Sequence, residues 1–228
     1  MTGPTDTHWG DGLPRMSSVY PDGVSHGRAG IVHRTVSPQD AVLAGICLMQ
    51  SGRGSVRAGE TYAELRIGGS LWMSDTRDER RDHMWVVHKA KGDVLIAGLG
   101  LGMVAIACAE KPNVSSVTVI EMNADVIALT EPHIRRRLGA RADVLRIIEA
   151  NALTWSPPKG AMFDAMWWDI WLNLCTDDLA EHATLNRRFA RRLRPGGYRG
   201  AWGSGFLQRQ KQREQEENRR AAMWRWRA

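Results

Sequence analysis

The stretch DVLIAGLGLGMVAIACAEKPNVSSVTVIEMNADV, residues 93–126, decides the fold of this chain. It opens with an apolar run, continues through the loop Gly98-Leu-Gly-Leu-Gly102, and enters a second apolar run at Met103–Glu110. A strand, a glycine turn and a helix in this order hold nucleotide-like ligands, because the glycines let the backbone approach closely and the helix N-terminus presents free N–H groups. The loop is therefore our first candidate for a ligand site.

Polar side chains follow the later strands of the same predicted sheet. Ser116–Glu121 ends in a carboxylate 21 residues after the middle glycine of the loop, where such folds place an acid that accepts hydrogen bonds from a ribose diol. Val144–Glu149 leads into Asn151, and Ala165–Asp169 ends at its own acid. Because parallel strands end at one edge of a sheet, we expect these groups to meet the glycine loop in one crevice.

The chain beyond Gly92 alternates strand-like and helical runs, which indicates a parallel α/β sheet. A first strand is expected at Asp93–Ala97 and a last one at Tyr198–Trp202, after a turn at residues 194–197 that stops the preceding helix. Helices are expected at Met103–Glu110, at Ala124–Leu129 with an extension, at Leu179–Leu193 and, exposed, at residues 207–226.

The N-terminal part has a different pattern. Residues 1–28 are polar and rich in glycine and proline, so we expect a flexible arm. Ala29–Val36 and Tyr62–Met73 contain alternating segments, with Gly68-Gly69 as a tight turn, which predicts a small antiparallel β unit. The segment Gln39–Gln50 between them fits either a strand or a short helix.

A charged helix is predicted between the β unit and the sheet. Thr76 and Glu79 have capping-box spacing, and the helix runs through the charged stretch Arg77–Lys89. Its charges Asp78, Arg81 and Asp82 are interpreted as a solvated face. The chain thus divides into an arm (1–28), a small β unit (29–75), a cofactor-binding domain (76–205) and a tail (206–228).

Charge and cysteine content narrow the function classes. The net charge is +6, but residues 187–228 carry +10 and residues 1–186 carry −4. A basic tail either tracks phosphates, as in nucleic-acid binding, or is a solvated helix face. Cys47, Cys108 and Cys175 lack metal-ligand spacing, so we expect buried thiols, no disulfide and no metal site. No signal peptide or membrane span is recognised, which favours a soluble cytoplasmic protein.

Two acids and four tryptophans of the fourth predicted strand need separate treatment. Asp164 starts that strand and is interpreted as structural, whereas Asp169 lies at the ligand edge and is the candidate catalytic residue. Large aromatic side chains next to a sheet either stack on a ligand or fill the core. Both alternatives stay open for Trp155, Trp168 and Trp171, and the core is favoured for Trp167.

A dinucleotide site is a rival interpretation of the glycine loop. Residues 100–105 fit the pattern G-x-G-x-x-A. That alignment leaves Gly98 without a role, whereas G-x-G-x-G uses all three glycines, so the second pattern is favoured.

Residues 62–203 resemble class I S-adenosylmethionine-dependent methyltransferases, within them the spermidine synthase-like branch. The likeness is most specific at residues 93–126, and Asp78-Glu79 with His88 keep a spacing typical of that branch. It implies a Rossmann-like sheet with strand order 3-2-1-4-5, a preceding antiparallel β unit, and S-adenosylmethionine as cofactor. It also implies cofactor-binding residues: Gly98, Gly100 and Gly102 at the methionine part, Glu121 at the ribose, and Asn151 and Ala152 at the adenine. Met122 and Asp169 are further cofactor-binding candidates, Asp169 by its likeness in position to the acid that follows the fourth strand.

The departures from the branch bear on the reaction. Leu101 replaces an acid of the aminopropyltransferase loop, Met73 stands near the place of a glutamine, and Asp82 replaces a tyrosine. Ile96 replaces an acid common in methyltransferases, and no sequence for a final antiparallel strand pair is recognised. Methyl transfer is therefore our first interpretation, aminopropyl transfer the second, and a non-catalytic protein that binds nucleic acid through its basic tail the third.

Overall fold

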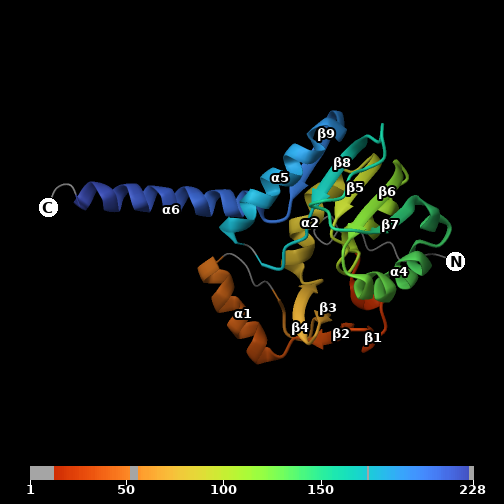
Figure 1. Cartoon of the computed structure of the whole chain (residues 1–228). Helices are drawn as coiled ribbons and strands as arrows, with labels where there is room; N and C mark the ends of the chain where they lie inside the picture. Colours follow the sequence, from red (N-terminus) through yellow and green to blue (C-terminus); the bar gives the residue numbers. More distant parts are fainter. Residues whose placement is uncertain (1–12, 52–55, 174, 226–228) are drawn as a thin grey trace.

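The protein contains two sheets, one parallel and one antiparallel (Figure 1). The computed structural model describes residues 13–51, 56–173 and 175–225. The parallel sheet has the order β7-β6-β5-β8-β9, which confirms the predicted 3-2-1-4-5 arrangement. Its strands are β5 (Gly92–Ala97), β6 (Val114–Glu121), β7 (Leu145–Glu149), β8 (Phe163–Trp168) and β9 (Leu193–Ala201).

Helices cover both faces of the parallel sheet. Val94 and Ile96 of β5 share one core with α2 (Arg77–Lys89), α3 (Met103–Ala109) and α4 (Ala124–Leu138). Leu95 and Ala97 point to the other face, where they share a second core with α5 (Leu179–Phe189). Alternate residues of one strand thus enter two cores, and this is why its sequence is apolar throughout.

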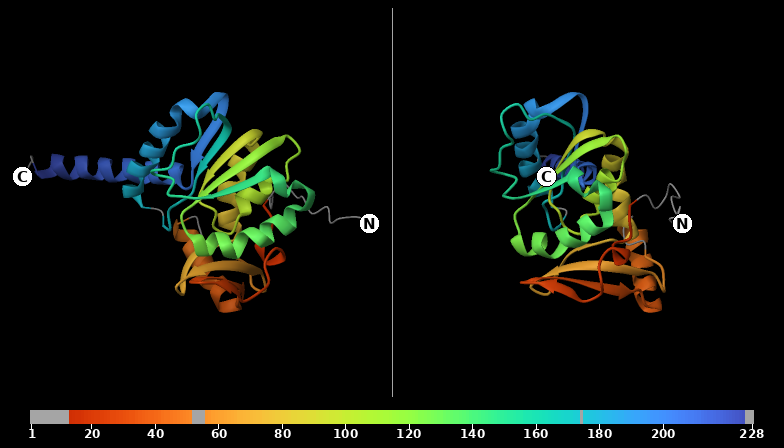
Figure 2. Two further views of the ribbon diagram at one scale, coloured as in Figure 1. Left: turned by 45° about the vertical axis from the view of Figure 1, so that its right-hand side comes forward. Right: turned by 90° about the vertical axis from the view of Figure 1, so that its right-hand side faces the viewer.

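The antiparallel sheet lies beneath the carboxyl edge of the parallel one (Figure 2). It has the order β1-β2-β3-β4, with β1 (Val24–His26), β2 (Ala29–Thr35), β3 (Thr61–Ile67) and β4 (Ser70–Ser74). Gly68 and Gly69 both have positive φ, at 58° and 83°, as the tight turn of a two-residue hairpin requires. The predicted β unit is therefore present, and the ambiguous segment forms the helix α1 (Pro38–Ser51).

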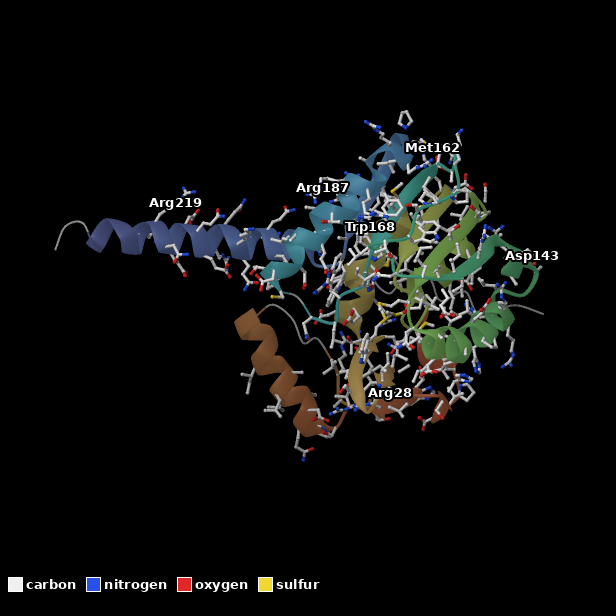
Figure 3. All side chains as sticks on the ribbon, in the orientation of Figure 1. Arg28, Asp143, Met162, Trp168, Arg187 and Arg219 are labelled. Carbon is white, nitrogen blue, oxygen red and sulfur yellow. The ribbon has the colours of Figure 1, made fainter. Side chains whose placement is uncertain are left out.

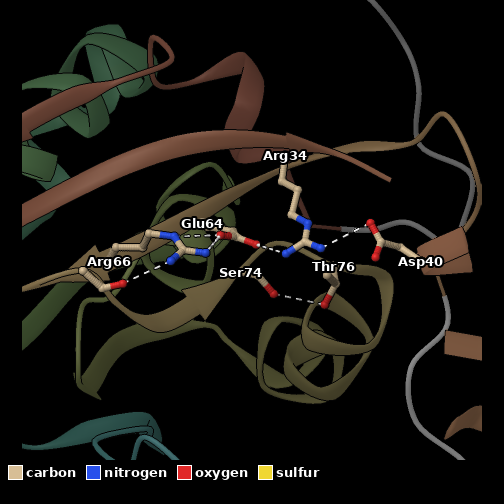
Figure 4. A network of polar contacts seen from close by, with 7 residues as sticks. Arg34, Asp40, Glu64, Arg66, Ser74 and Thr76 are labelled. Carbon is tan, nitrogen blue, oxygen red and sulfur yellow. Dashed lines mark hydrogen bonds and ion pairs between the residues drawn. The ribbon is translucent and has the colours of Figure 1, made fainter. Parts of the chain in front are cut away.

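A buried carboxylate ties this sheet together (Figure 4). Glu64 is 2% exposed and accepts a 2.9 Å hydrogen bond from Nε of Arg66, and Nη1 of Arg34 lies 3.8 Å from its other oxygen. Arg34 also pairs with Asp40 of α1 at 3.2 Å. A buried acid is tolerated when it is paired and hydrogen-bonded in this way, so the network links α1 to the sheet.

The segment expected as a flexible N-terminal arm is packed against the body at residues 13–28, the part of it that the structure describes. Leu13, Met16 and Tyr20 are buried, with 3%, 0% and 2% exposure. The Tyr20 hydroxyl donates a 2.8 Å hydrogen bond to the carbonyl of Leu101, and Asp75 accepts from the Met16 backbone N–H. The prediction of an unpacked segment is wrong for residues 13–28, because three widely spaced apolar anchors suffice to dock it; residues 1–12 lie outside the described residues.

Helix α2 begins as predicted after Thr76, but its charges are not all solvated. Thr76 makes no side-chain capping bond. Asp78 is 5% exposed and pairs with Arg81 at 2.8 Å. The prediction of an exposed face fails at Asp78, because α2 packs against α3 and against β8 and β9 of the parallel sheet.

Three further expectations are corrected. The turn predicted at residues 194–197 lies inside β9, where the register shifts opposite β8, and the helix ends earlier, with α5 at Phe189 and a 3-10 turn at Ala190–Arg192. Cys108 is buried, which raises its pKa to about 12, but Cys175 is exposed; the Cys47 side chain lies outside the described part. The tail forms α6 (Ser204–Arg225), which starts earlier than expected and projects from the body (Figure 1); residue 226 lies outside the described chain.

Among the described residues, no helix combines the length and the apolarity needed to cross a membrane.

Candidate functional site

A cavity of about 570 Å³ opens at the carboxyl edge of the parallel sheet, above the antiparallel sheet. This volume is in the range of small-molecule sites. Of the predicted binding residues, it is lined by Gly98, Gly100, Glu121, Met122, Asn151, Ala152 and Asp169. Gly102 is the exception, because it precedes α3 at φ 76° with Ile134 where a side chain would be.

The glycine loop leaves no room for side chains. Gly98 has φ 94°, and a Cβ there would overlap the backbone carbonyl of Asp169. Gly100 has φ 50°, and a Cβ there would overlap the sulfur of Met73, which accepts a 3.3 Å contact from the Leu101 N–H. Glycine is therefore required at both positions, because each has a positive φ and because neighbouring atoms occupy the space of a side chain.

Glu121 joins the loop to the end of β6. Its Oε2 accepts a 2.9 Å hydrogen bond from the Leu99 backbone N–H, and its Oε1 accepts a 2.8 Å bond from Asn123 N–H. Two carboxylate oxygens can accept about four hydrogen bonds. The carboxylate is thus fixed in place and keeps acceptor capacity for a ligand.

Asn151 and Ala152 form the wall beyond β7. The Asn151 side-chain oxygen accepts a 2.9 Å bond from Leu153 N–H, so its amide NH₂ group is the part left to donate. Ala152 is 6% exposed. Together they offer a donor and a small apolar surface.

Asp169 follows β8 and is held from two sides. Its N–H donates to the Ala97 carbonyl at 2.8 Å, and its Oδ2 lies 3.5 Å from Nε2 of the buried His83 on α2. Burial, followed by the charges of Glu79, Asp82 and Glu121, raises the pKa of this carboxyl well above its ordinary value. A carboxyl with a raised pKa holds a proton more tightly than an exposed aspartate, as a general base requires.

Other lining residues come from elements that the sequence did not connect with the site. Among them are Trp72 on β4, Glu79 on α2, Glu181 on α5 and Trp202 after β9. Nε1 of Trp171 donates a 2.7 Å hydrogen bond to Glu181. Hydrophobic periodicity could not reveal them, because the docking of the antiparallel sheet and α5 brings them to the cavity.

The four tryptophans considered from sequence separate into two groups. Trp171 lines the cavity, whereas Trp167 and Trp168 are 4% and 0% exposed and belong to the cores. Trp155 stacks on Phe189 of α5, with 6.2 Å between ring centroids. The core interpretation of Trp167 is confirmed, and Trp72 supplies the aromatic wall that the sequence left unassigned.

The lining of the cavity is strongly acidic. It contains Glu79, Glu121, Asp125, Asp169 and Glu181, and within the described chain it contains no lysine, arginine or histidine. Negative charges gathered in a cleft with low-dielectric walls add to one another's electrostatic potential. The cavity therefore attracts cations and repels anions.

Strand order, glycine loop and edge cavity decide the fold. The parallel sheet has the strand order of a Rossmann-like α/β fold. Ile96 and Leu101, two positions at which the sequence departs from the family that it resembles, are buried, with 2% and 0% exposure. Neither of these two side chains lines the cavity.

Comparison with known proteins gives partial overlaps. No protein-family profile matches the chain. A polyamine aminopropyltransferase of Prochlorococcus marinus (strain MIT 9312) is 29% identical over 89 residues, which cover 36% of this chain and 31% of that protein. The chain thus matches about a third of the length of this curated relative.

Solved structures overlap about half of the chain. The [4+2]-cyclase SpnF is 23% identical with a TM-score of 0.43, over 55% of this chain and 45% of that one. The N-methyltransferase NodS from Bradyrhizobium japonicum WM9 is 19% identical with a TM-score of 0.41, over 52% of this chain and 64% of that one. The fold assignment accordingly rests on the strand order and register of this chain itself.

Proposed function

We propose that the acid-lined cavity binds S-adenosylmethionine and that the protein is a methyltransferase. The observation that carries the proposal is the lining charge: five carboxyl groups and, in the described chain, no basic side chain. The ligand's sulfonium is a cation, which this wall favours. A dinucleotide carries an anionic pyrophosphate, which the same wall repels, so the rival interpretation of residues 100–105 loses support.

The residues around the cavity fit such a ligand. Gly98 and Gly100 line the cavity where we place its methionine part, and Glu121 has free acceptor capacity for ribose hydroxyls. The cofactor supplies an electrophilic methyl group when bound. Asp169 then takes the proton that the acceptor loses, and the cavity walls position the two reactants.

Aminopropyl transfer is the second candidate, and two observations favour it. The curated relative that overlaps this chain is named an aminopropyltransferase. In addition, the lining described above offers no basic partner to the carboxylate of S-adenosylmethionine, which its decarboxylated form lacks. Against it stands Leu101, a fully buried side chain in place of the acid of that loop.

Calorimetric titration of the full chain with S-adenosylmethionine, its decarboxylated form and NAD separates these candidates. Tighter binding of S-adenosylmethionine supports methyl transfer, and tighter binding of the decarboxylated form replaces it with aminopropyl transfer. Glu121→Gln should weaken the preferred ligand about tenfold or more, because it removes a charge-assisted acceptor. Glu149→Gln, at the neighbouring strand end but outside the cavity lining, is the matched control. Failure of all three ligands to bind contradicts the proposal.

A non-catalytic role through the tail is supported by one further observation. Residues 208–220 of α6 are all exposed, and the side chains along them, Arg219 among them, extend away from the body (Figure 3). A projecting basic helix is accessible to a polyanion such as nucleic acid.

A further inference from the structure

A second cavity, of about 410 Å³, lies at the start of α6. It is bounded by α2, by the end of β9 and by the first turns of α6, so it is separate from the acidic cavity in its lining residues. Its charged lining residues are Arg81, Asp82 and Arg209. Arg81 is paired with Asp78 at 2.8 Å, so Arg209 is the guanidinium of this lining with no ion pair in the described chain, and the lining is less acidic than that of the first cavity.

The first turn of α6 has unsatisfied donors that face this cavity. Gly203 precedes the helix at φ 65° and has no side chain to cap it. Within the described chain the first backbone N–H of this region to find an acceptor is that of Leu207, which donates to the Gly203 carbonyl at 2.9 Å. Ser204, Gly205 and Phe206 therefore present their N–H groups at the positive end of a helix of 22 residues.

Arg209 places a cation beside that positive end. A Cβ added to Gly205 would lie 3.5 Å from an Nη atom of Arg209, so the guanidinium is folded back along the first turn. Arg209 forms no ion pair with any residue that the structure describes. A cation at a helix N-terminus is unfavourable, and a bound anion would relieve the repulsion.

Trp167 supplies an independent donor. Its side chain is 4% exposed and lines the cavity, and its Nε1–H has no hydrogen-bond partner within the described residues. Burial of a donor without an acceptor is unfavourable.

Aromatic side chains form the walls. Trp85 is 56% exposed and Phe206 is 38% exposed, and Tyr198 completes the lining. Lys89 Nζ already lies 4.8 Å over the Trp85 ring and His88 packs beside it, so a planar ligand ring would meet Phe206 and the remaining edge of Trp85. The cavity thus combines groups that bind an anion with groups that bind a ring.

We propose that this second cavity binds a small anion attached to an aromatic ring, such as an aryl phosphate. The anionic group lies between Arg209, Arg81 and the first turn of α6, and the ring lies against Trp85 and Phe206. The proposal does not depend on the function assigned to the acidic cavity.

Calorimetric titration of the full chain with phenyl phosphate tests this assignment. The dissociation constant is expected at about 1 mM or below. Inorganic phosphate, which has the anion without the ring, and benzyl alcohol, which has the ring without the anion, should each bind more weakly. Arg209→Gln should weaken binding about tenfold, as expected for loss of a charge-assisted bond. Arg213→Gln, one turn further along α6 and outside the cavity lining, should leave it unchanged.

A second readout locates the ligand. In ¹H–¹⁵N spectra the indole N–H resonance of Trp167, assigned by its loss in Trp167→Phe, should shift on addition of phenyl phosphate. Titrations repeated with S-adenosylmethionine present should give the same affinity ratio between the two arginine variants. No binding at about 10 mM, equal effects of the two arginine variants, or an unmoved Trp167 resonance would overturn the proposal.

Discussion

At Asp169 the ionised carboxyl group that the proposed activity requires is unfavourable for the stability of the fold. Its folded-state pKa is raised, chiefly by burial. The folded protein therefore binds this proton more tightly than the unfolded chain does. The contribution of this carboxyl group to the free energy of unfolding is therefore largest below the unfolded-state pKa, near 4. That contribution is lost as the pH rises from there to the folded-state pKa.

Asp169→Asn should remove this penalty and, with it, the proton acceptor. We expect a higher melting temperature than the wild type at pH 7, a difference that shrinks as the pH is lowered toward about 4. We also expect turnover to fall about 10²- to 10⁴-fold, with cofactor affinity within about tenfold of wild type, a change of about 1.4 kcal/mol. Thermal unfolding over a pH series and titration with the cofactor measure both. A variant that melts lower than wild type at neutral pH would contradict the assignment.

Single residues also show how far the sequence could predict this site. Gly98, Gly100, Glu121, Asn151 and Asp169 were found because each follows a strand of a parallel sheet, and topology sends such ends to one edge. Trp72 and Trp202 were not found, because their approach to the cavity depends on how separate elements dock. No local period in the sequence encodes that docking.

At the scale of elements, β8 has an acid near each end with a different role. Asp164 accepts a 2.8 Å hydrogen bond from Asp93 N–H and pairs with Arg194, which also contacts Asp93 at 2.8 Å. These contacts join β5, β8 and β9 at the edge away from the cavity. The prediction that Asp164 is structural agrees with this geometry.

Asp164→Ala should therefore destabilise the protein without affecting ligands. We expect a loss of about 1–3 kcal/mol in the free energy of unfolding, because a part-buried charged acceptor is removed from two partners. Asp143→Ala is the control, since Asp143 is exposed at the far side of the sheet (Figure 3). Denaturant unfolding measures the first effect, and cofactor titration should give the same affinity for both variants. A tenfold change in affinity would instead place Asp164 in the binding machinery.

Elements differ in how well local patterns predicted them. Most of the parallel strands and the helices α2, α3 and α5 were placed within a few residues, because apolar runs and glycine turns are local signals. Helix α4 runs to Leu138, well past the Leu129 from which an extension was expected, and β9 begins at Leu193, before the expected Tyr198. The segment 13–28 was missed, because Leu13, Met16 and Tyr20 have no regular spacing and are ordered only by contact with distant residues such as Leu101 and Asp75. Burial of Asp78 was missed for the same reason.

On the scale of the whole molecule, charge is divided between two poles. The acidic cavity lies between the sheets, and the basic residues collect at the C-terminal end, where α6 leaves the body (Figure 1). Leu207 is 1% exposed and anchors α6 to the core, whereas residues 208–220 are exposed. The anchor and the projecting part can therefore be separated by a truncation.

A chain ending at Gln210 keeps Leu207 and Arg209 and removes most of the projecting helix. We expect its melting temperature to stay within about 2 °C of the full chain, since residues 211–220, which the truncation removes, are exposed. If the tail binds nucleic acid, retention of single-stranded oligonucleotides should be lost. In the full chain the slope of log affinity against log salt should then be about −0.7 for each phosphate contacted.

Exchange of Arg213, Arg219 and Arg220 for glutamine should reproduce the loss of retention, and exchange of Glu214, Glu216 and Glu217 for glutamine should not. Retention that survives truncation would leave α6 as a solvated helix and remove the basis for the nucleic-acid role.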